Sequence, residues 1–226
     1  MTSVLRPHAP VAERALLPGD PGRALRLAQQ LLEGPKMVNH HRGLWGYSGE
    51  AADGRPMTIQ STGLGGPSAA AVVADLIALG ARRLVRVGTA DAPPGGVAPG
   101  GLLVAEAVLP GDGASRALGA EGPLAADAAL VGALRAAAGP GVRAGVVAST
   151  DLLPEHDPAA RWPDVEAVDL TSAAVLAAAA RGGAAAASVL GISGVLGDGG
   201  RLELEALEAL EAELGRIAAA ALASRQ

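Results

Sequence analysis

The chain has 226 residues, half of them apolar and 18% charged, a composition that supports a sizeable core and excludes an intrinsically disordered protein. Its net charge of −5 argues against nucleic acid or an anionic membrane as a partner, and the absence of cysteine excludes disulfides and thiolate metal sites. No apolar segment has the length of a membrane span or the form of a secretion signal. We therefore expect a cytoplasmic, globular protein that forms one domain over residues 1–226.

The turn between the first predicted strand and the first predicted helix is a candidate anion site. The apolar run Ala15 to Leu17 is broken by Pro18-Gly19, and Asp20-Pro21 then supplies an N-cap and the first residue of a helix. Free backbone N–H groups at a helix start attract anions, and Arg23 adds a positive charge. An ordinary strand-to-helix turn is the alternative. We expect this helix to end at Gly34-Pro35.

The rest of the chain continues to alternate between strand-like and helix-like segments. Residues 44–51 and 56–61 form a predicted hairpin closed by Asp53-Gly54, a dipeptide typical of type I′ turns. Further strands are expected at 83–89, 102–109, 143–149, 165–169 and 184–192, and further helices at 69–79, 124–137, 171–181 and from 202 onward. The pattern predicts an α/β fold with a largely parallel central sheet.

The last predicted helix is amphipathic. Apolar residues recur at helical spacing from Leu207 to Ala221, while Glu203, Glu208 and Glu211 lie opposite them. We interpret these glutamates as the solvated face of the helix.

Arg86 stands in the middle of a predicted strand, between Val85 and Val87. An arginine in a strand buried on both faces is unfavourable unless its charge is paired or binds a ligand. We expect Arg86 to bind an anion, with Gly88-Thr89 adding donors at the carboxyl end of the strand, where ligands of open α/β sheets bind. A structural salt bridge is the alternative.

Six motifs, in their order and spacing, make nearly the whole chain resemble the nucleoside phosphorylases of the purine and uridine phosphorylase type. They are LLPGDPGR (16–23), HHRG (40–43), STGLGGPSAA (61–70), GARRLVRVGT (80–89), DGAS (112–115) and ASTDLL (148–153). STGLGGPS and DGAS are more similar to uridine phosphorylases. The resemblance implies a three-layer α/β/α fold with a central mixed, mostly parallel sheet, and a homo-oligomer, either a dimer or a trimer of dimers.

The resemblance also implies a phosphate site. Its expected residues are Gly19, Arg23, Arg86 and Thr89, with Arg42 reaching in from an adjacent subunit. All five positions are present. Inorganic phosphate would be the co-substrate, with no cofactor and no metal; the four histidines form no convincing ligand set.

The implied nucleoside site departs from the family pattern. Asp169-Leu170-Thr171 stands where the family has Glu-Met-Glu, whose second glutamate binds the ribose hydroxyls. Leu153 replaces the aromatic residue that stacks on the base. The stretch that reads uracil is missing between His156 and Val165, and Ile192-Ser193-Gly194 stands where purine phosphorylases place an aspartate that protonates the leaving base. In the N-terminal arm, His8 is similar to a histidine that crosses the dimer interface toward the sugar, with a solvated histidine as the alternative.

Ala90-Asp91 follows Thr89 where the family has a small residue and glycine, so a carboxylate faces the nucleoside space. Asp91 either pairs with a neighbouring arginine as a structural group or accepts hydrogen bonds from a sugar hydroxyl or a base N–H. We expect the second role, with Arg86 and Asp91 as the catalytic residues. The expected nucleoside-binding residues are His8, Ala90, Asp91, Leu153, Asp169, Leu170 and Thr171.

The resemblance implies phosphorolysis of a nucleoside N-glycosidic bond to free base and sugar 1-phosphate. Because the phosphate positions are present and the nucleoside positions are changed, we expect an atypical base or sugar. The alternative is a catalytically impaired homologue that binds phosphate or a nucleoside and acts as a binding or regulatory protein.

Overall fold

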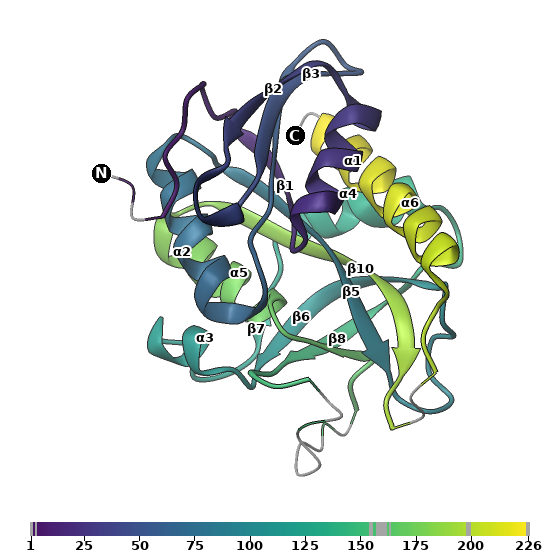
Figure 1. The fold of residues 1–226 in the computed structure, drawn as a ribbon. Coiled ribbons are helices and arrows are strands. Elements are labelled where there is room, and N and C mark those ends of the chain that lie inside the picture. Colours follow the sequence, from purple (N-terminus) through teal and green to yellow (C-terminus); the bar gives the residue numbers. More distant parts are fainter. Residues whose placement is uncertain are drawn as a thin grey trace.

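In the part of the chain that the structure describes, a mixed sheet of ten strands carries helices on both of its faces (Figure 1). The computed structural model describes residues 2, 4–153, 156, 162, 164–197 and 200–224. The strands follow the order β10-β6-β8-β9-β5-β1-β4-β3-β2, with β7 paired to β6 and β10 also paired to β5. The predicted three-layer α/β fold with a mixed central sheet is therefore confirmed.

The centre of the sheet is a set of parallel strands. β1 (Arg14–Pro18) lies between β4 (Pro56–Gln60) and β5 (Arg83–Ala92), parallel to both, and β10 (Ala185–Val195) lies parallel to β5. β1 is buried at every position, as expected for an apolar strand covered on both faces. The carboxyl ends of β1, β5 and β10 consequently point the same way, toward the loops that form the site.

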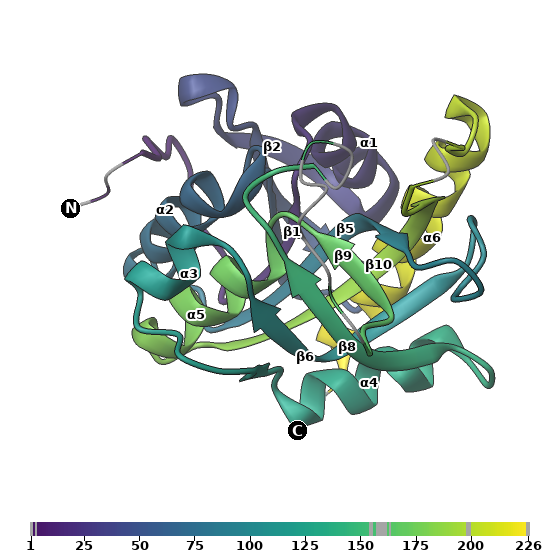
Figure 2. The same cartoon turned by 90° about the horizontal axis from the view of Figure 1, so that it is seen from below.

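Five strands close into a ring at one end of the sheet (Figure 2). β10 pairs antiparallel with β6 (Leu102–Pro110), which runs parallel to β8 (Arg143–Ser149). β8 pairs with β9 (Ala167–Asp169), and β9 returns to β5 through the pair Asp91 and Val168. This closure brings the end of β9 beside β5, which the order of the strands along the chain does not reveal.

A hairpin extends the other end of the sheet. β3 (Gly46–Ala51) pairs antiparallel with β4, as predicted, and with β2 (Leu32–Asn39), which the sequence did not predict. The first helix ends three residues earlier than expected, because Leu32 is already extended and begins the pairing with β3. The turn type was also predicted wrongly: Gly54 has a positive φ but Asp53 does not, whereas a type I′ turn needs both.

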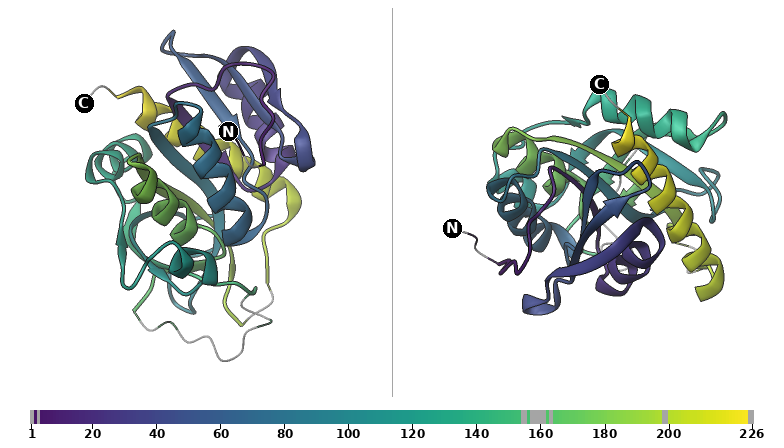
Figure 3. Two further views of the ribbon diagram at one scale, coloured as in Figure 1. Left: turned by 90° about the vertical axis from the view of Figure 1, so that its left-hand side faces the viewer. Right: turned by 90° about the horizontal axis from the view of Figure 1, so that it is seen from above.

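Helices α2 (Gly65–Ala78), α3 (Gly113–Ala117) and α5 (Ser172–Gly182) cover one face of the sheet. α2 and α5 contact each other and lie side by side in Figure 3 (left). Their core includes Leu17 of β1, whereas the neighbouring Leu16 points to the opposite face, as the period of two in a strand requires.

Helices α1 (Pro21–Leu31), α4 (Ala128–Ala138) and α6 (Leu204–Ala223) cover the opposite face. α6 contacts both α1 and α4 (Figure 3, right). α4 begins later than predicted, because Asp127 caps it by accepting a hydrogen bond from Leu130 N, and the preceding residues form the short strand β7 (Leu124–Ala125). No described helix is both long and apolar enough to cross a membrane.

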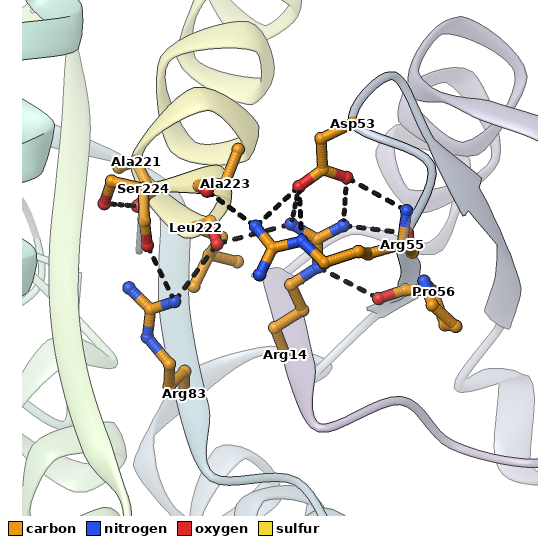
Figure 4. Close-up of polar contacts among 9 residues, drawn as sticks. All are labelled: Arg14, Asp53, Arg55, Pro56, Arg83, Ala221, Leu222, Ala223 and Ser224. Atoms are coloured by element: carbon orange, nitrogen blue, oxygen red, sulfur yellow. Dashed lines mark hydrogen bonds and ion pairs between the residues drawn. The ribbon is translucent and has the colours of Figure 1, made fainter. Parts of the chain in front are cut away.

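Arginines from three segments fix the carboxyl end of α6 (Figure 4). Arg14 and Arg83 donate to Leu222 O, and Arg55 donates to Ala223 O. Arg14 and Arg55 also bind the carboxylate of Asp53 in the hairpin loop, at 2.5 and 2.6 Å. Positive charges near the last carbonyls of a helix are favourable, so the cluster ties α6 to β1, β5 and the hairpin.

Candidate functional site

A pocket of about 350 Å³ opens at the carboxyl ends of β1 and β5, and we call it the site pocket. Most of its lining comes from the turns that follow β1 and β4, from the second half of β5 and from the segment between β9 and α5. The lining residues are Gly19, Asp20, Pro21, Arg23, Gly63, Leu64, Arg86, Thr89, Ala90, Asp91, Leu153, Val168, Asp169, Leu170, Thr171, Ser193 and Arg201. All the site residues expected from the sequence line this one pocket, except Arg42 and His8.

The turn after β1 has the geometry that its sequence predicts. Asp20 caps α1 by accepting a hydrogen bond from Arg23 N at 2.6 Å, and Pro21 is the first helical residue. The second glycine-rich turn is joined to it, because Gly63 N donates to Gly19 O at 3.0 Å. Two backbone segments and the amino end of α1 thus approach the same end of the pocket, a geometry suited to an oxyanion.

Arg23 reaches from α1 toward β5 and α6. Its Nη1 donates to Val87 O at 3.3 Å, and its Nη2 lies 2.5 Å from a carboxylate oxygen of Glu211. Its Nε is buried and has no hydrogen-bond partner among the described residues. Glu211 is only 4% exposed, so the prediction that it lies on a solvated face is wrong. The helical period placed Glu211 opposite the leucines, but α1 covers that side of α6.

Arg86 is buried in β5 and forms an ion pair with Asp169 of β9. Its Nε and Nη2 lie 3.0 and 2.9 Å from Asp169 Oδ2, and Nε is also 3.2 Å from Ser172 Oγ. Burial lowers the pKa of Arg86, and the charge of Asp169 counteracts this shift. The structural salt bridge that we named as the alternative is therefore present. Arg86 nevertheless lines the pocket, and its binding of an anion stays a prediction.

Asp169 is bonded on every side. Ser149 Oγ donates to its Oδ1 at 2.5 Å and Ser172 Oγ donates to its Oδ2 at 2.7 Å, while backbone N–H groups of Thr171 and Ser172 donate to the same carboxylate. These hydrogen bonds fix the Asp169 carboxylate in the position in which it pairs with Arg86. Sequence reasoning missed Ser149 and Ser172, because small polar residues at the ends of elements carry no distinctive signal.

Asp91 pairs with Arg201 and still faces the site pocket. Its Oδ2 lies 3.0 Å from Arg201 Nη2, and its Oδ1 accepts from Ser193 Oγ at 3.1 Å. The strand ladder shifts register between Ile192 and Gly194, so that Gly194 is the partner of Asp91. The arginine pair matches the structural alternative for Asp91, while its place in the pocket wall leaves the binding role open as a prediction.

Aliphatic side chains form a further part of the pocket wall. Leu64, Leu153, Val168 and Leu170 line it, and no aromatic residue is among the described lining residues. Leu64 and Leu153 are 82% and 38% exposed. The described part of this wall therefore offers apolar contact but no aromatic ring.

His8 and Arg42 lie outside the site pocket of their own chain. His8 stacks on His40 with ring centroids 5.4 Å apart, and the exposed Arg42 has a φ of 59° in the turn η1 (His41–Gly43). Asn39 holds this arrangement together: its amide donates to Leu44 O and its Oδ1 accepts from Arg6 N at 2.8 Å. The arm and the turn are therefore joined through Asn39 and the His8–His40 stack.

Within the described residues, no group of three histidine, aspartate or glutamate side chains is arranged to hold a metal ion. The described lining of the site pocket includes the arginines Arg23, Arg86 and Arg201, hydroxyl groups, backbone donors, and the arginine-paired carboxylates Asp91 and Asp169.

Comparison with known proteins identifies phosphorylases as the relatives of this chain. A family model described as the phosphorylase superfamily matches residues 13–224. The chain is 34% identical over 197 residues to a DeoD-type purine nucleoside phosphorylase of Geobacillus kaustophilus, covering 81% of each chain. It is 37% identical over 145 residues to a uridine phosphorylase of Thermococcus kodakarensis, covering 62% of this chain and 52% of that protein.

A third relative is a DeoD-type purine nucleoside phosphorylase of Oceanobacillus iheyensis, 43% identical over 83 residues, or 36% of this chain. The matched region spans 35% of the Oceanobacillus protein and 52% of the Thermococcus protein. The relatives thus include both purine and uridine phosphorylases.

Proposed function

The chain belongs to the phosphorylase superfamily, and from this membership we propose that it is a nucleoside phosphorylase, a pentosyltransferase that uses inorganic phosphate. The reaction breaks the N-glycosidic bond of a nucleoside, joins a phosphate oxygen to the anomeric carbon and releases the base with its bonding electrons. One observation carries the proposal: the expected phosphate residues Gly19, Arg23, Arg86 and Thr89 all line one pocket.

The phosphate end of the pocket fits the needs of this reaction. Phosphate attack on an anomeric carbon passes through an oxocarbenium-like state, so the protein mainly positions the nucleophile and stabilises charge. Arg23 and Arg86 supply positive charge, and Thr89 and the start of α1 supply further donors. In this proposal Arg86 touches the reacting phosphate, phosphate is the co-substrate and no further cofactor takes part.

Asp91 is the proposed recognition residue of the nucleoside end. Ser193 and Arg201 occupy only part of its hydrogen-bonding capacity, since a carboxylate can accept about four hydrogen bonds. One hydrogen bond from Ser193 and two from Arg201 leave about one acceptor position for a sugar hydroxyl or a base N–H. Thr171 stands where the family has a ribose-binding glutamate, so Asp91 offers a replacement carboxylate from a different strand.

The substrate proposed for this pocket has an atypical base or sugar. The wall formed by Leu64, Leu153 and Leu170 provides apolar contact without aromatic stacking. A base whose binding depends on stacking would bind weakly there. A base or sugar that fits the apolar wall and donates a hydrogen bond to Asp91 would bind more tightly.

The proposal includes a homo-oligomer, either a dimer or a trimer of dimers. His8 and Arg42 lie outside the pocket lining of their own chain, and the resemblance places these residues in a neighbour's site. Because Asn39 already joins the arm to the η1 turn, presenting both side chains to a partner would cost little conformational entropy.

A second candidate function is a binding or regulatory protein with impaired catalysis. One observation favours it: both arginines of the proposed phosphate site already have carboxylate partners. Glu211 pairs with Arg23, and Asp169 pairs with Arg86. Purified protein incubated with a panel of purine and pyrimidine nucleosides, with and without phosphate, separates the two functions. Phosphate-dependent release of a base supports the phosphorylase, whereas phosphate binding without release of any base supports the second function.

A further inference from the structure

A buried carboxylate of the last helix joins two arginines of the first. Glu211 Oε1 lies 2.5 Å from Arg23 Nη2, and Glu211 Oε2 lies 2.6 Å from Arg26 Nη2. α6 runs beside α1, yellow beside purple in Figure 1, and the two helices are far apart in the sequence. The Arg23 and Glu211 side chains are 9% and 6% exposed, whereas Arg26 is 45% exposed.

Packing of α6 does not require this carboxylate. Leu210, Leu214 and Ile217 bury the apolar side of the helix in the core. A buried carboxylate is unfavourable unless it is paired, and an apolar residue at the α1–α6 contact would avoid that desolvation. The ion pair thus calls for an explanation other than the anchoring of α6.

The geometry around Arg23 supplies one. Glu211 holds Nη2 and Val87 O holds Nη1, so two of the three guanidinium nitrogens are bonded to the protein. Nε has no partner among the described residues, and Arg23 lines the site pocket. We infer that Glu211 is a positioning residue for phosphate: it fixes the Arg23 guanidinium so that its remaining N–H groups serve the anion.

This inference rests on the proposed function and assigns α6 a part in it. It also predicts whether neutralising Glu211 strengthens or weakens phosphate binding. By Coulomb's law alone, neutralising a carboxylate near an anion site strengthens anion binding. If Glu211 instead orients Arg23, neutralising it releases the guanidinium and weakens phosphate binding, even though the protein gains positive charge.

The test is Glu211→Gln, with Glu208→Gln as the matched control. Glu208 lies on the same helix, and its carboxylate is 3.6 Å from the same Arg26, but its side chain is 45% exposed and the ion pair of Arg23 is with Glu211. Calorimetric titration with inorganic phosphate measures the affinity directly. We expect Glu211→Gln to bind phosphate about tenfold more weakly, the size expected for loss of one charged hydrogen bond, and Glu208→Gln to stay within about twofold.

Two further variants keep the test decisive. Glu211→Asp retains the charge but withdraws the carboxylate, and it should also weaken phosphate binding. In the Arg23→Ala background, Glu211→Gln should add nothing, because Glu211 acts through Arg23. Unfolding curves identify a variant that fails to fold, in which case the Glu211→Asp result decides.

Turnover separates this inference from the proposed function. In phosphorolysis, Glu211→Gln should raise the KM for phosphate with little change in the KM for the nucleoside. Unchanged or tighter phosphate binding in both Glu211 variants overturns the positioning role, whatever the wild type catalyses. A wild type that binds phosphate but cleaves no nucleoside overturns the proposed function and leaves the effect of Glu211 measurable. A wild type that binds no phosphate overturns both.

Discussion

Asp91 of β5 and Gly194 of β10 are partners in the strand ladder, and Asp91 Oδ1 lies 3.1 Å from the place where a Cβ atom on residue 194 would stand. The carboxylate thus uses space that a glycine on the neighbouring strand leaves open. By the resemblance, the segment Ile192-Ser193-Gly194 stands where purine phosphorylases carry an aspartate. A carboxylate is therefore present at this wall of the pocket, but it comes from the adjacent strand.

Asp91→Asn tests whether this carboxylate recognises the substrate. The amide keeps the shape but replaces one acceptor oxygen with a donor, so we expect kcat/KM for the nucleoside to fall by about 100-fold. Phosphate affinity should be equal or higher, because a negative charge is removed from the pocket. Steady-state kinetics combined with phosphate titration check both parts. Unchanged turnover and nucleoside binding would show that Asp91 serves only as the partner of Arg201.

Arg86→Ala should be the most damaging single change to phosphate binding. Among the expected phosphate residues, Arg86 is the one whose charge is buried in a central strand. We expect phosphate binding to be lost in calorimetric titration, with the fold retained in the circular dichroism spectrum. An Arg86→Ala variant that binds phosphate like the wild type would contradict the proposed phosphate site.

Asp169→Asn should destabilise the protein. The substitution leaves the Arg86 charge buried without its counterion, and breaking a buried pair in this way typically costs about 3–5 kcal/mol. Urea unfolding of the variant and the wild type at neutral pH measures the difference. Asp151→Asn is a suitable control, because Asp151 is exposed and its carboxylate accepts a hydrogen bond from the backbone Gly113 N. Equal stability of the Asp169 variant would contradict the anchoring role.

The Asp53 cluster should make stability depend on pH in acid. Hydrogen bonds from Arg14 and then from Arg55 hold the pKa of the Asp53 carboxyl well below its ordinary value of 3.8. A carboxyl with a depressed pKa stabilises the fold above its unfolded pKa, and that contribution is lost as the pH falls through the folded pKa. Asp53→Asn should therefore be less stable than the wild type at pH 7, by about 1–2 kcal/mol.

The difference should shrink progressively below about pH 4, where the unfolded state takes up the proton that the folded state resists. Urea unfolding between pH 7 and pH 3 follows this trend. A gap between wild type and Asp53→Asn that stays constant over this range would count against the ion-pair explanation.

Subunit complementation tests whether Arg42 acts in a neighbour's pocket. Arg42→Ala and Arg86→Ala should each be inactive alone. Mixed oligomers should regain activity, because the Arg42→Ala chain keeps a complete pocket and receives Arg42 from its Arg86→Ala partner. Random mixing of equal amounts in dimers should restore about a quarter of the wild-type activity. No recovery in oligomers shown to be mixed, or a monomer with full activity, would refute the shared site.

The sequence predicted the local features of the site more accurately than the contacts between distant segments. The Asp20-Pro21 start of α1 and the burial of Arg86 could both be inferred from a few adjacent residues. The partners of the two arginines could not. Asp169 lies 83 residues from Arg86, and Glu211 lies 188 residues from Arg23, so only the closure of β9 on β5 and the packing of α6 on α1 bring them together.

The errors in the predicted elements have a similar cause. β2 is an edge strand containing Pro35, and such a segment has no strong strand signal of its own. It forms because β3 offers it a partner. Glu211 fits a solvated helical face by its spacing, but that face meets α1 in the fold. Both errors arise where tertiary contacts override a local pattern.

The measurement that tests the central claim most directly is phosphorus NMR of the protein with inorganic phosphate and each nucleoside of the panel. We predict that, for at least one nucleoside, the phosphate signal is converted into that of a sugar 1-phosphate in step with release of the base. Arg86→Ala should abolish the conversion. Release of the base without consumption of phosphate, or no conversion with any nucleoside although phosphate binds, would contradict the assignment of phosphorolysis to this protein.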